Sequence, residues 1–117
     1  MAEKTTTKKA NKSPTIKEII HTTYETALQC YGVVGISRFD AAIKDDYAPL
    51  EESKASRGIF VRKIANGQFD VDLYVILSCE VKLTETSFEC QKVVRYALNR
   101  EYNHSCRKVN LFVVSIK

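Results

Sequence analysis

The chain has 117 residues, of which 44% are hydrophobic and 27% are charged, the composition of one globular domain with a single core. No apolar run approaches the roughly 18 residues that a membrane-spanning helix needs, and the first residues lack the apolar stretch of a secretory signal. We therefore expect a cytoplasmic protein.

The net charge of +4 is concentrated in the N-terminal residues 1–13. This segment has almost no apolar residues, so it cannot bury enough surface to offset the entropy lost on ordering. We expect a disordered basic tail at 1–13 and one folded, nearly neutral domain at 14–117. The tail lysines either act as solubilising groups or attract acidic lipid or nucleic acid, and both readings stay open. They are Lys4, Lys8, Lys9 and Lys12.

A first helix is predicted over residues 15–31. Thr15 and Glu18 have the spacing of a capping box, in which the two side chains satisfy backbone amides at the start of the helix. Apolar residues then recur at three- and four-residue steps, which indicates one buried face. Gly32 follows directly and is of the residue type that commonly ends a helix.

Gly32 and Gly35 form a GxxG pattern, which has two interpretations. In K-homology domains such a loop joins two helices and holds a nucleic-acid backbone. Here a β-branched run follows Gly32, which favours a corner between the helix and a first strand at about 33–39. We prefer the structural interpretation and keep a small K-homology-like nucleic-acid-binding domain as the alternative.

A β-hairpin is the clearest local signal in the chain. Asn66 and Gly67 can adopt the positive φ angles of a two-residue type I′ turn, and strand-forming runs flank them. From Phe69 to Cys79 apolar residues alternate with others, so one face of this strand is predicted to cover the core. Between 40 and 48 we expect a helical turn or two, because long bare loops are unusual in compact domains.

The opposite face of the second hairpin strand carries Asp70, Asp72, Tyr74 and Ile76. The two aspartates have no third ligand or histidine near them, so we interpret them as exposed solubilising groups rather than a metal or acid–base pair. Tyr74 and Ile76 would form an apolar patch beside polar residues, which often marks a contact. We predict that these two residues contact a partner.

A second helix and a last strand complete the predicted elements. The helix is expected to begin at a cap on Thr84 or Thr86 and to bury one apolar side. The strand, at about 107–116, is apolar on both faces near its end, which predicts a place inside the sheet rather than at an exposed edge. The expected buried residues of the helix are Phe88, Cys90, Val93, Val94, Ala97, Leu98 and Tyr102.

Motifs of common catalytic and metal sites are absent from the sequence. There is no P-loop, no dinucleotide-binding GxGxxG, no GxSxG and no HExxH. The cysteines lack CxxC spacing, so we expect free thiols that mostly act as small buried apolar residues. They are Cys30, Cys79, Cys90 and Cys106. We predict no catalytic residue, no metal ligand and no cofactor.

The predicted order of elements is α-β-β-β-α-β. Two main helices packed on one face of a mostly antiparallel four-stranded sheet are the economical arrangement for this order. The sequence therefore predicts an α+β fold of the two-layer sandwich type.

Four stretches resemble the bacterial alkaline shock protein family of envelope stress response proteins. In chain order they read "YGVVGIS", "RGIFVRKIANGQFDVDLYVILSCEVKL", "CQKVVRYAL" and "VNLFVVSI". The resemblance covers residues 15–117. It implies a small cytoplasmic protein without known enzymatic activity, linked to cell-envelope homeostasis. In some relatives it implies a place at the membrane through a partner, and in others an association with fatty-acid metabolism.

On these grounds we expect a non-catalytic interaction protein. It would self-associate or dock on a protein of the envelope or of lipid metabolism, with peripheral membrane association through that partner. Nucleic acid is the less favoured partner.

Overall fold

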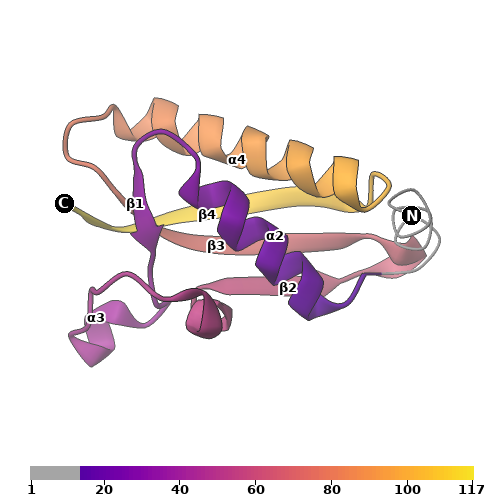
Figure 1. The fold of residues 1–117 in the computed structure, drawn as a ribbon, viewed down its shortest axis with the longest axis horizontal. Coiled ribbons are helices and arrows are strands. Elements are labelled where there is room, and N and C mark those ends of the chain that lie inside the picture. Colours follow the sequence, from indigo (N-terminus) through magenta and orange to yellow (C-terminus); the bar gives the residue numbers. More distant parts are fainter. Residues whose placement is uncertain (1–13) are drawn as a thin grey trace, which may run out of the picture.

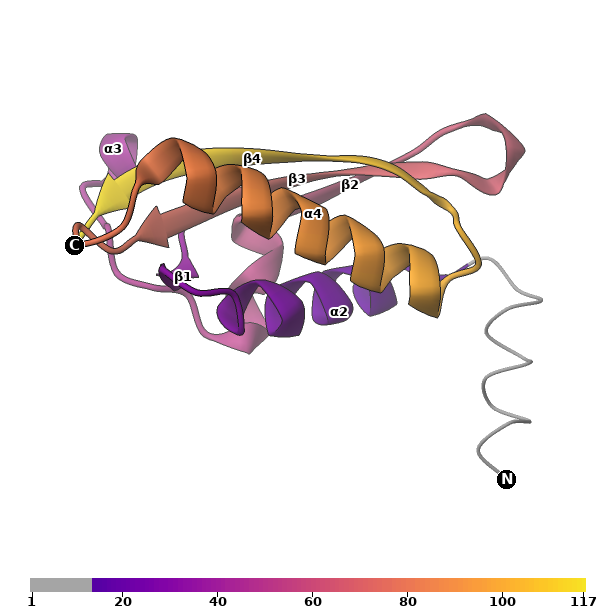
Figure 2. The ribbon, with the colours of Figure 1, turned by 90° about the horizontal axis from the view of Figure 1, so that it is seen from above.

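Two long helices and four strands form the described part of the chain, residues 14–117, in this computed structural model (Figure 1). The tail predicted at residues 1–13, with its four lysines, lies outside the described residues. Helices α2 and α4 pack side by side on one face of the sheet, which confirms the predicted two-layer α+β fold (Figure 2). The elements are α2 (Ile16–Leu28), β1 (Val33–Ile36), α3 (Ala41–Lys44), η1 (Glu52–Arg57), β2 (Ile59–Lys63), η2 (Ala65–Gly67), β3 (Phe69–Leu77), α4 (Leu83–Glu101) and β4 (Cys106–Ile116).

Strand β3 is the centre of the sheet. Strands β1 and β2 both pair with it antiparallel, and β4 pairs with it in parallel along nearly its whole length. The backbone of Tyr74 donates to the carbonyl of Gly58 and accepts from the amide of Ser37, so β2 and β1 lie end to end along the same edge of β3. The predicted mostly antiparallel sheet is thus confirmed.

Strand β4 is an edge strand, and the prediction that it lies inside the sheet was wrong. Among residues 14–117 it pairs only with β3. Both faces of β4 carry apolar residues because each face packs against another part of the chain, and not because strands flank β4 on both sides. On the inner face Val109 is buried where α4 packs on β4, and on the outer face Phe112 stacks on Tyr74. The ribbon of the described residues shows no strand beyond β4 (Figure 1).

The capping box at the start of α2 is confirmed. The amide of Glu18 donates to the Thr15 hydroxyl at 3.1 Å, and the amide of Thr15 donates to the Glu18 carboxylate at 2.9 Å. The helix ends at Leu28, three residues before the predicted end, and Gln29 caps it.

The GxxG pattern is the predicted corner between a helix and a strand. Gly32 has a φ of +87°, and a Cβ added there would lie 2.9 Å from the Thr86 side chain in α4. A side chain at this position would therefore be strained in conformation and also crowded. Strand β1 begins at Val33, so the two-helix setting of a K-homology loop is not formed here.

The hairpin connection is one residue longer than predicted. Asn66 and Gly67 both have positive φ, at 66° and 73°, as the type I′ turn requires. The Ile64 amide, however, donates to the Gln68 carbonyl at 2.9 Å, so the connection between the paired strands is the three-residue segment Ala65–Gly67.

The core lies between the inner face of β3 and the two long helices. The residues of β3 that the alternation assigned to the core are all fully buried. In α4 the buried residues are Cys90, Val94 and Leu98, whereas Phe88 and Val93 are 61% and 40% exposed, so their predicted burial was wrong. At about 100° per residue, both lie more than a quarter turn from the buried direction.

The start of α4 and the segment before β2 also differ from the prediction. Helix α4 begins at Leu83 after Lys82, and no side chain caps it, so neither Thr84 nor Thr86 has the predicted role. The helical turn expected at 40–48 is α3, and a second turn, η1, follows it. Within residues 14–117, no helix combines the length and the apolar character needed to cross a bilayer.

Candidate functional site

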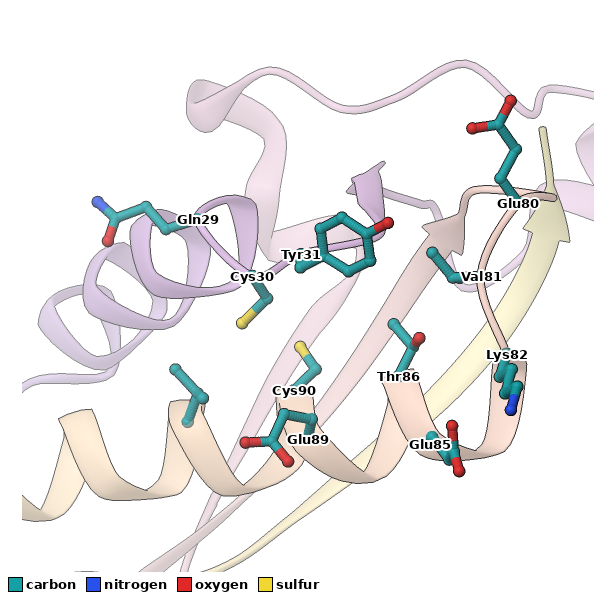
Figure 3. A pocket seen from close by; sticks show the side chains of 11 residues that line it. Gln29, Cys30, Tyr31, Glu80, Val81, Lys82, Glu85, Thr86, Glu89 and Cys90 are labelled. Atoms are coloured by element: carbon teal, nitrogen blue, oxygen red, sulfur yellow. The ribbon is translucent and has the colours of Figure 1, made fainter.

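A hollow of about 590 Å³ lies where the end of α2 faces the first half of α4. Figure 3 shows Cys30 and Cys90 pointing toward one another inside it, with Tyr31 and Glu89 beside them. Its lining mixes apolar, acidic and thiol groups. The two cysteines come from segments 60 positions apart, and their meeting was not predicted from the sequence.

The outer face of the sheet, away from α2 and α4, carries four aromatic side chains in contact, which we call the aromatic row. Tyr74 and Phe112 are stacked with ring centroids 4.8 Å apart and an interplanar angle of 22°. Phe60 meets the Tyr74 ring edge-on at 5.9 Å, and Phe39 meets the Phe60 ring edge-on at 5.3 Å. Since Phe39 is 54% exposed and Phe112 43% exposed, the row offers apolar surface at both ends.

Of the two contact residues predicted on this face, only Tyr74 retains accessible surface. Tyr74 is half-buried in the aromatic row. Ile76 is fully buried, so its predicted role as an exposed contact was wrong. It lies between Gly35 of β1 and Ser115 of β4, toward the end of the sheet where α3 lies across from the long helices (Figure 2). The alternation along β3 correctly predicted the face of the sheet on which Ile76 lies. It did not predict that other parts of the chain bury this side chain.

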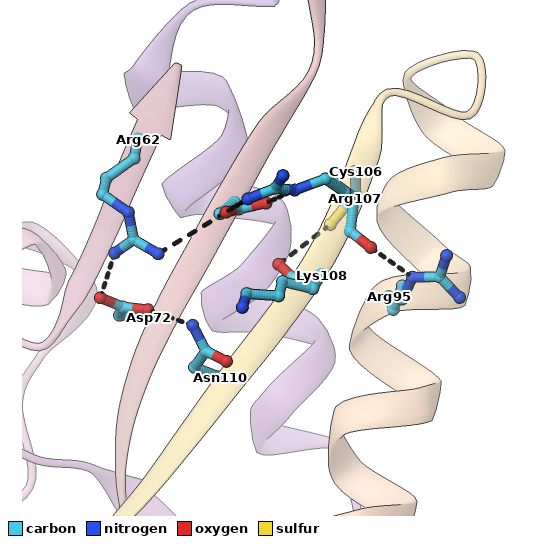
Figure 4. A network of polar contacts seen from close by, with 8 residues as sticks. Arg62, Asp72, Arg95, Cys106, Arg107, Lys108 and Asn110 are labelled. Carbon is cyan, nitrogen blue, oxygen red and sulfur yellow. Dashed lines mark hydrogen bonds and ion pairs between the residues drawn. The ribbon is translucent and has the colours of Figure 1, made fainter. Parts of the chain in front are cut away.

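Asp70 and Asp72 belong to a polar network on the same face, and the prediction that they are exposed solubilising groups was wrong. Asp70 is 2% exposed and accepts two hydrogen bonds from Arg107, at 2.6 and 3.1 Å. Arg62 forms ion pairs with both aspartates, and the Asn110 amide donates to Asp72 at 2.9 Å (Figure 4).

Arg107 has the largest effect on the pKa of Asp70. Its two-pronged hydrogen bond holds the pKa of that carboxyl below its usual range, with a further contribution from the charge of Arg62. The arginines come from β2 and β4, so the network depends on the register of three strands.

The free edge of β4 is covered in its first half and open in its second. Two side chains of α4 donate to β4 carbonyls: Gln91 to that of Val109 at 3.0 Å and Arg95 to that of Arg107 at 3.1 Å. Along 110–116 no side chain of the described chain bonds to the backbone. We call residues 110–116 the open edge. Its most exposed apolar residues are Phe112, Val113 and Ile116.

A groove of about 430 Å³ follows the covered half of β4, and we call it the basic groove. Its cations are Lys92, Arg95 and Arg100 of α4 together with Lys108 of β4, and no carboxylate of the described chain lines it. Two exposed aromatic residues border it, with Lys92 over the Phe88 ring and Arg100 over the Tyr96 ring at 5.3 and 5.7 Å. The sequence alone does not reveal this groove, because Lys108 is distant in the chain from the three cations of α4.

One group of possible metal ligands occurs among residues 14–117. His21 lies between Glu25 and Glu52, and all three are exposed. Each ring nitrogen of His21 faces a different carboxylate, which is the arrangement of an ion-pair cluster rather than of three ligands around one ion. We assign no metal to it.

The comparisons with known proteins agree on a family. The model of the alkaline shock protein 23 family, which is the alkaline shock protein family and is described as having a "cell envelope-related function", matches residues 3–117. The chain is 32% identical over 92 residues to the uncharacterized protein YloU of Bacillus subtilis (strain 168), covering 78% of this chain and 75% of that protein. It is 31% identical over 93 residues to the uncharacterized protein Spy1614 of Streptococcus pyogenes serotype M6, covering 79% of this chain and 75% of that protein.

The fold has relatives among solved structures. The structure of MamM-CTD 215-293 superposes with a TM-score of 0.54 at 12% sequence identity, over 86% of this chain and 99% of that one. At this level of identity the likeness concerns the fold alone. The family match over residues 3–117 and the two relatives lead to one assignment: the chain belongs to the alkaline shock protein family, whose function is related to the cell envelope.

Proposed function

We propose that this protein is a non-catalytic interaction module that acts in a cell-envelope process by adding a strand of a protein partner to the open edge of β4. The observation that carries the proposal is that edge itself: residues 110–116 are partly exposed, mostly apolar and bonded on one side only, to β3.

Natural proteins usually protect their sheet edges. They place lysine, proline or inward-pointing charges on them, or cover them with another element. The open edge contains no charged residue and no proline. Its one irregularity is at Val114, which has no counterpart in the register with β3, so pairing is regular as far as Val113. An extended partner segment can bond to the backbone up to that point.

The neighbouring surfaces define the chemistry of the partner segment. Phe112 brings the aromatic row to the open edge, so an apolar or aromatic side chain of an added strand would extend the row. The basic groove continues along the same strand toward its start, where acidic residues of the partner would meet Lys108 and Arg95. We therefore expect an extended apolar segment with acidic residues on one side.

The family's envelope-related function supports a place for this contact at the membrane. We propose that the protein stays in the cytoplasm and reaches the membrane through its partner. The partner would belong to the envelope or to lipid metabolism, and a second copy of the chain is the simplest competitor for the same edge.

The experiment compares partner binding by the wild type, by a double variant of the open edge and by a control variant. Phe112→Lys with Ile116→Lys places two charges on the open edge. Ile43→Lys is the matched control, because Ile43 is an apolar residue of α3 with 85% exposure. Thermal unfolding checks that each variant folds. Partners captured in the native cell are identified and purified, and their binding to each purified variant is measured. Hydrogen exchange of the backbone amides of residues 110–116 is then measured with and without the purified partner.

We expect the purified partner to protect the amides of 110–116, and we expect binding to be lost in the edge variant and kept in Ile43→Lys. Protection that appears on raising the concentration of the protein alone identifies a second copy as the occupant. A partner that binds the edge variant as well as the wild type rules out the proposed surface.

A further inference from the structure

The side chains of Cys30 and Cys90 point toward one another across the hollow between α2 and α4 (Figure 3). Cys30 follows the last turn of α2, where its thiol donates a hydrogen bond to the carbonyl of Thr26 at 3.5 Å. Cys90 lies in α4 and is 1% exposed, whereas Cys30 is partly exposed and lines the hollow. The pair therefore consists of one accessible thiol and one buried thiol.

The two sulfur atoms differ in acidity. The neighbouring Cys90 thiol lowers the pKa of Cys30, against the opposing effect of burial. The neighbouring Cys30 thiol, together with burial, raises the pKa of Cys90. Because the thiolate is the reactive form, the accessible sulfur is the better nucleophile and the buried one keeps its proton.

We propose that Cys30 and Cys90 form a site of reversible oxidation by peroxides, which closes to a disulfide between α2 and α4. In the first step the Cys30 thiolate attacks a peroxide oxygen and the O–O bond breaks. With hydrogen peroxide, hydroxide leaves and takes up a proton as water, and Cys30 becomes a sulfenic acid.

In the second step the Cys90 sulfur loses its proton and attacks the Cys30 sulfur. The S–O bond breaks, hydroxide leaves and combines with that proton to form water, and the S–S bond forms. The net reaction converts two thiols and one hydrogen peroxide into one disulfide and two waters. The thiol pair loses two electrons and the peroxide gains them.

The other cysteines lack this arrangement. Cys79 is exposed, and within residues 14–117 it has no hydrogen bond to another thiol. Cys106 is buried, which raises the pKa of its thiol to about 11. A disulfide at the Cys30–Cys90 pair would join the end of α2 to the first half of α4 and narrow the hollow, without involving the open edge of β4.

The test treats the purified full chain with hydrogen peroxide and maps its disulfides by mass spectrometry without reduction. We expect the mass to fall by that of two hydrogen atoms, the crosslinked peptides to contain Cys30 and Cys90, and the product to be reversed by dithiothreitol. The Cys79→Ser variant is the control and should give the same crosslink. Four thiols that remain free to alkylation, or a crosslink only between Cys79 residues of two chains, would overturn the proposal.

A second variant tests the order of the steps without requiring the disulfide. In Cys90→Ala the sulfenic acid has no partner thiol, so a dimedone-type trap should label a several-fold larger share of the oxidised Cys30 than in the wild type. An equal labelled share of oxidised Cys30 in the two proteins would show that Cys90 does not resolve the sulfenic acid, and the site as proposed would be wrong.

Discussion

Tyr74 stacks on Phe112 across strands β3 and β4, with ring centroids 4.8 Å apart, and this pair links the buried centre of the sheet to its open edge. Both residues stand on the outer face, at directly opposite positions in the register. The stacking therefore helps to hold an edge strand that, within residues 14–117, has a neighbour on one side only.

We predict that Tyr74 and Phe112 are coupled energetically. A double-mutant cycle with Tyr74→Leu and Phe112→Leu, measured by denaturant unfolding, should give a coupling free energy of about 0.5–1.5 kcal/mol, the usual value for an aromatic pair. Phe88→Leu is the control in a cycle with Tyr74→Leu, since Phe88 lies on α4, on the other side of the sheet. Coupling of the same size in the control cycle would contradict the assignment.

The second prediction concerns the pH dependence of stability through Asp70. Its pKa in the folded state is lowered, chiefly by the hydrogen bonds from Arg107, so the ionised form is favoured by folding. The contribution of ionised Asp70 to stability is complete above the pKa of this aspartate in the unfolded chain, about 3.9. It is lost as the pH falls through the lower pKa that Asp70 has in the folded state.

In the Asp70→Asn variant we therefore expect a lower Tm at pH 7 and a smaller fall in Tm between pH 7 and pH 2 than in the wild type. Glu80→Gln, at an exposed position, is the control and should keep the wild-type profile. An Asp70→Asn profile parallel to that of the wild type would show that this carboxyl does not contribute to acid unfolding.

Local signals in the sequence predicted the elements but not how they meet. The capping box of Thr15 and Glu18, the positive φ of Asn66 and the alternation along β3 all depend on residues a few positions apart, and the structure confirms them. The burial of Asp70 depends on Arg107, which is 37 positions away, and on the register between β3 and β4. No local pattern contains that information.

The candidate surface was predictable only in part, for the same reason. Tyr74 was predicted from its position on the outer face of the sheet. The burial of Ile76 was not predicted, because it depends on other elements of the fold and not on the sequence of β3. The apolar character of β4 was read as burial between strands. An edge strand packed under a helix on one face and against an aromatic ring on the other gives the same pattern.

The third prediction compares the helix cap at Thr15 of α2, which the structure contains, with the cap expected at Thr84 of α4, which it does not. Thr15→Ala removes the hydroxyl that accepts from the Glu18 amide and should lower the free energy of unfolding by about 1 kcal/mol. Thr84→Ala, within the first turn of α4, removes no cap and should be neutral within about 0.5 kcal/mol. Denaturant unfolding of both variants measures the difference, and equal losses would contradict the two assignments.

The fourth prediction concerns the corner at Gly32. An alanine at a positive φ costs about 1–2 kcal/mol from conformation alone, and Gly67→Ala, where a Cβ meets nothing within 4 Å, should show that cost. Gly32→Ala adds a contact of 2.9 Å with Thr86, so we expect a loss of about 2–4 kcal/mol. The same unfolding measurement compares the two, and a larger loss at Gly67 would contradict the crowding at the corner.

The last prediction concerns the pKa of Cys30, which the neighbouring Cys90 thiol lowers. The rate of alkylation of Cys30 by iodoacetamide, followed by mass spectrometry across the pH range, reports the fraction of thiolate. In the wild type the Cys90 thiol lowers that pKa, so the reaction should begin at a lower pH than in Cys90→Ala, where this thiol is missing. Cys79→Ser leaves the pair intact and should reproduce the wild-type midpoint for Cys30. If the pH midpoint of Cys30 alkylation stays the same or moves to lower pH when Cys90 is replaced, the Cys90 thiol does not lower the pKa of Cys30, and the prediction is wrong.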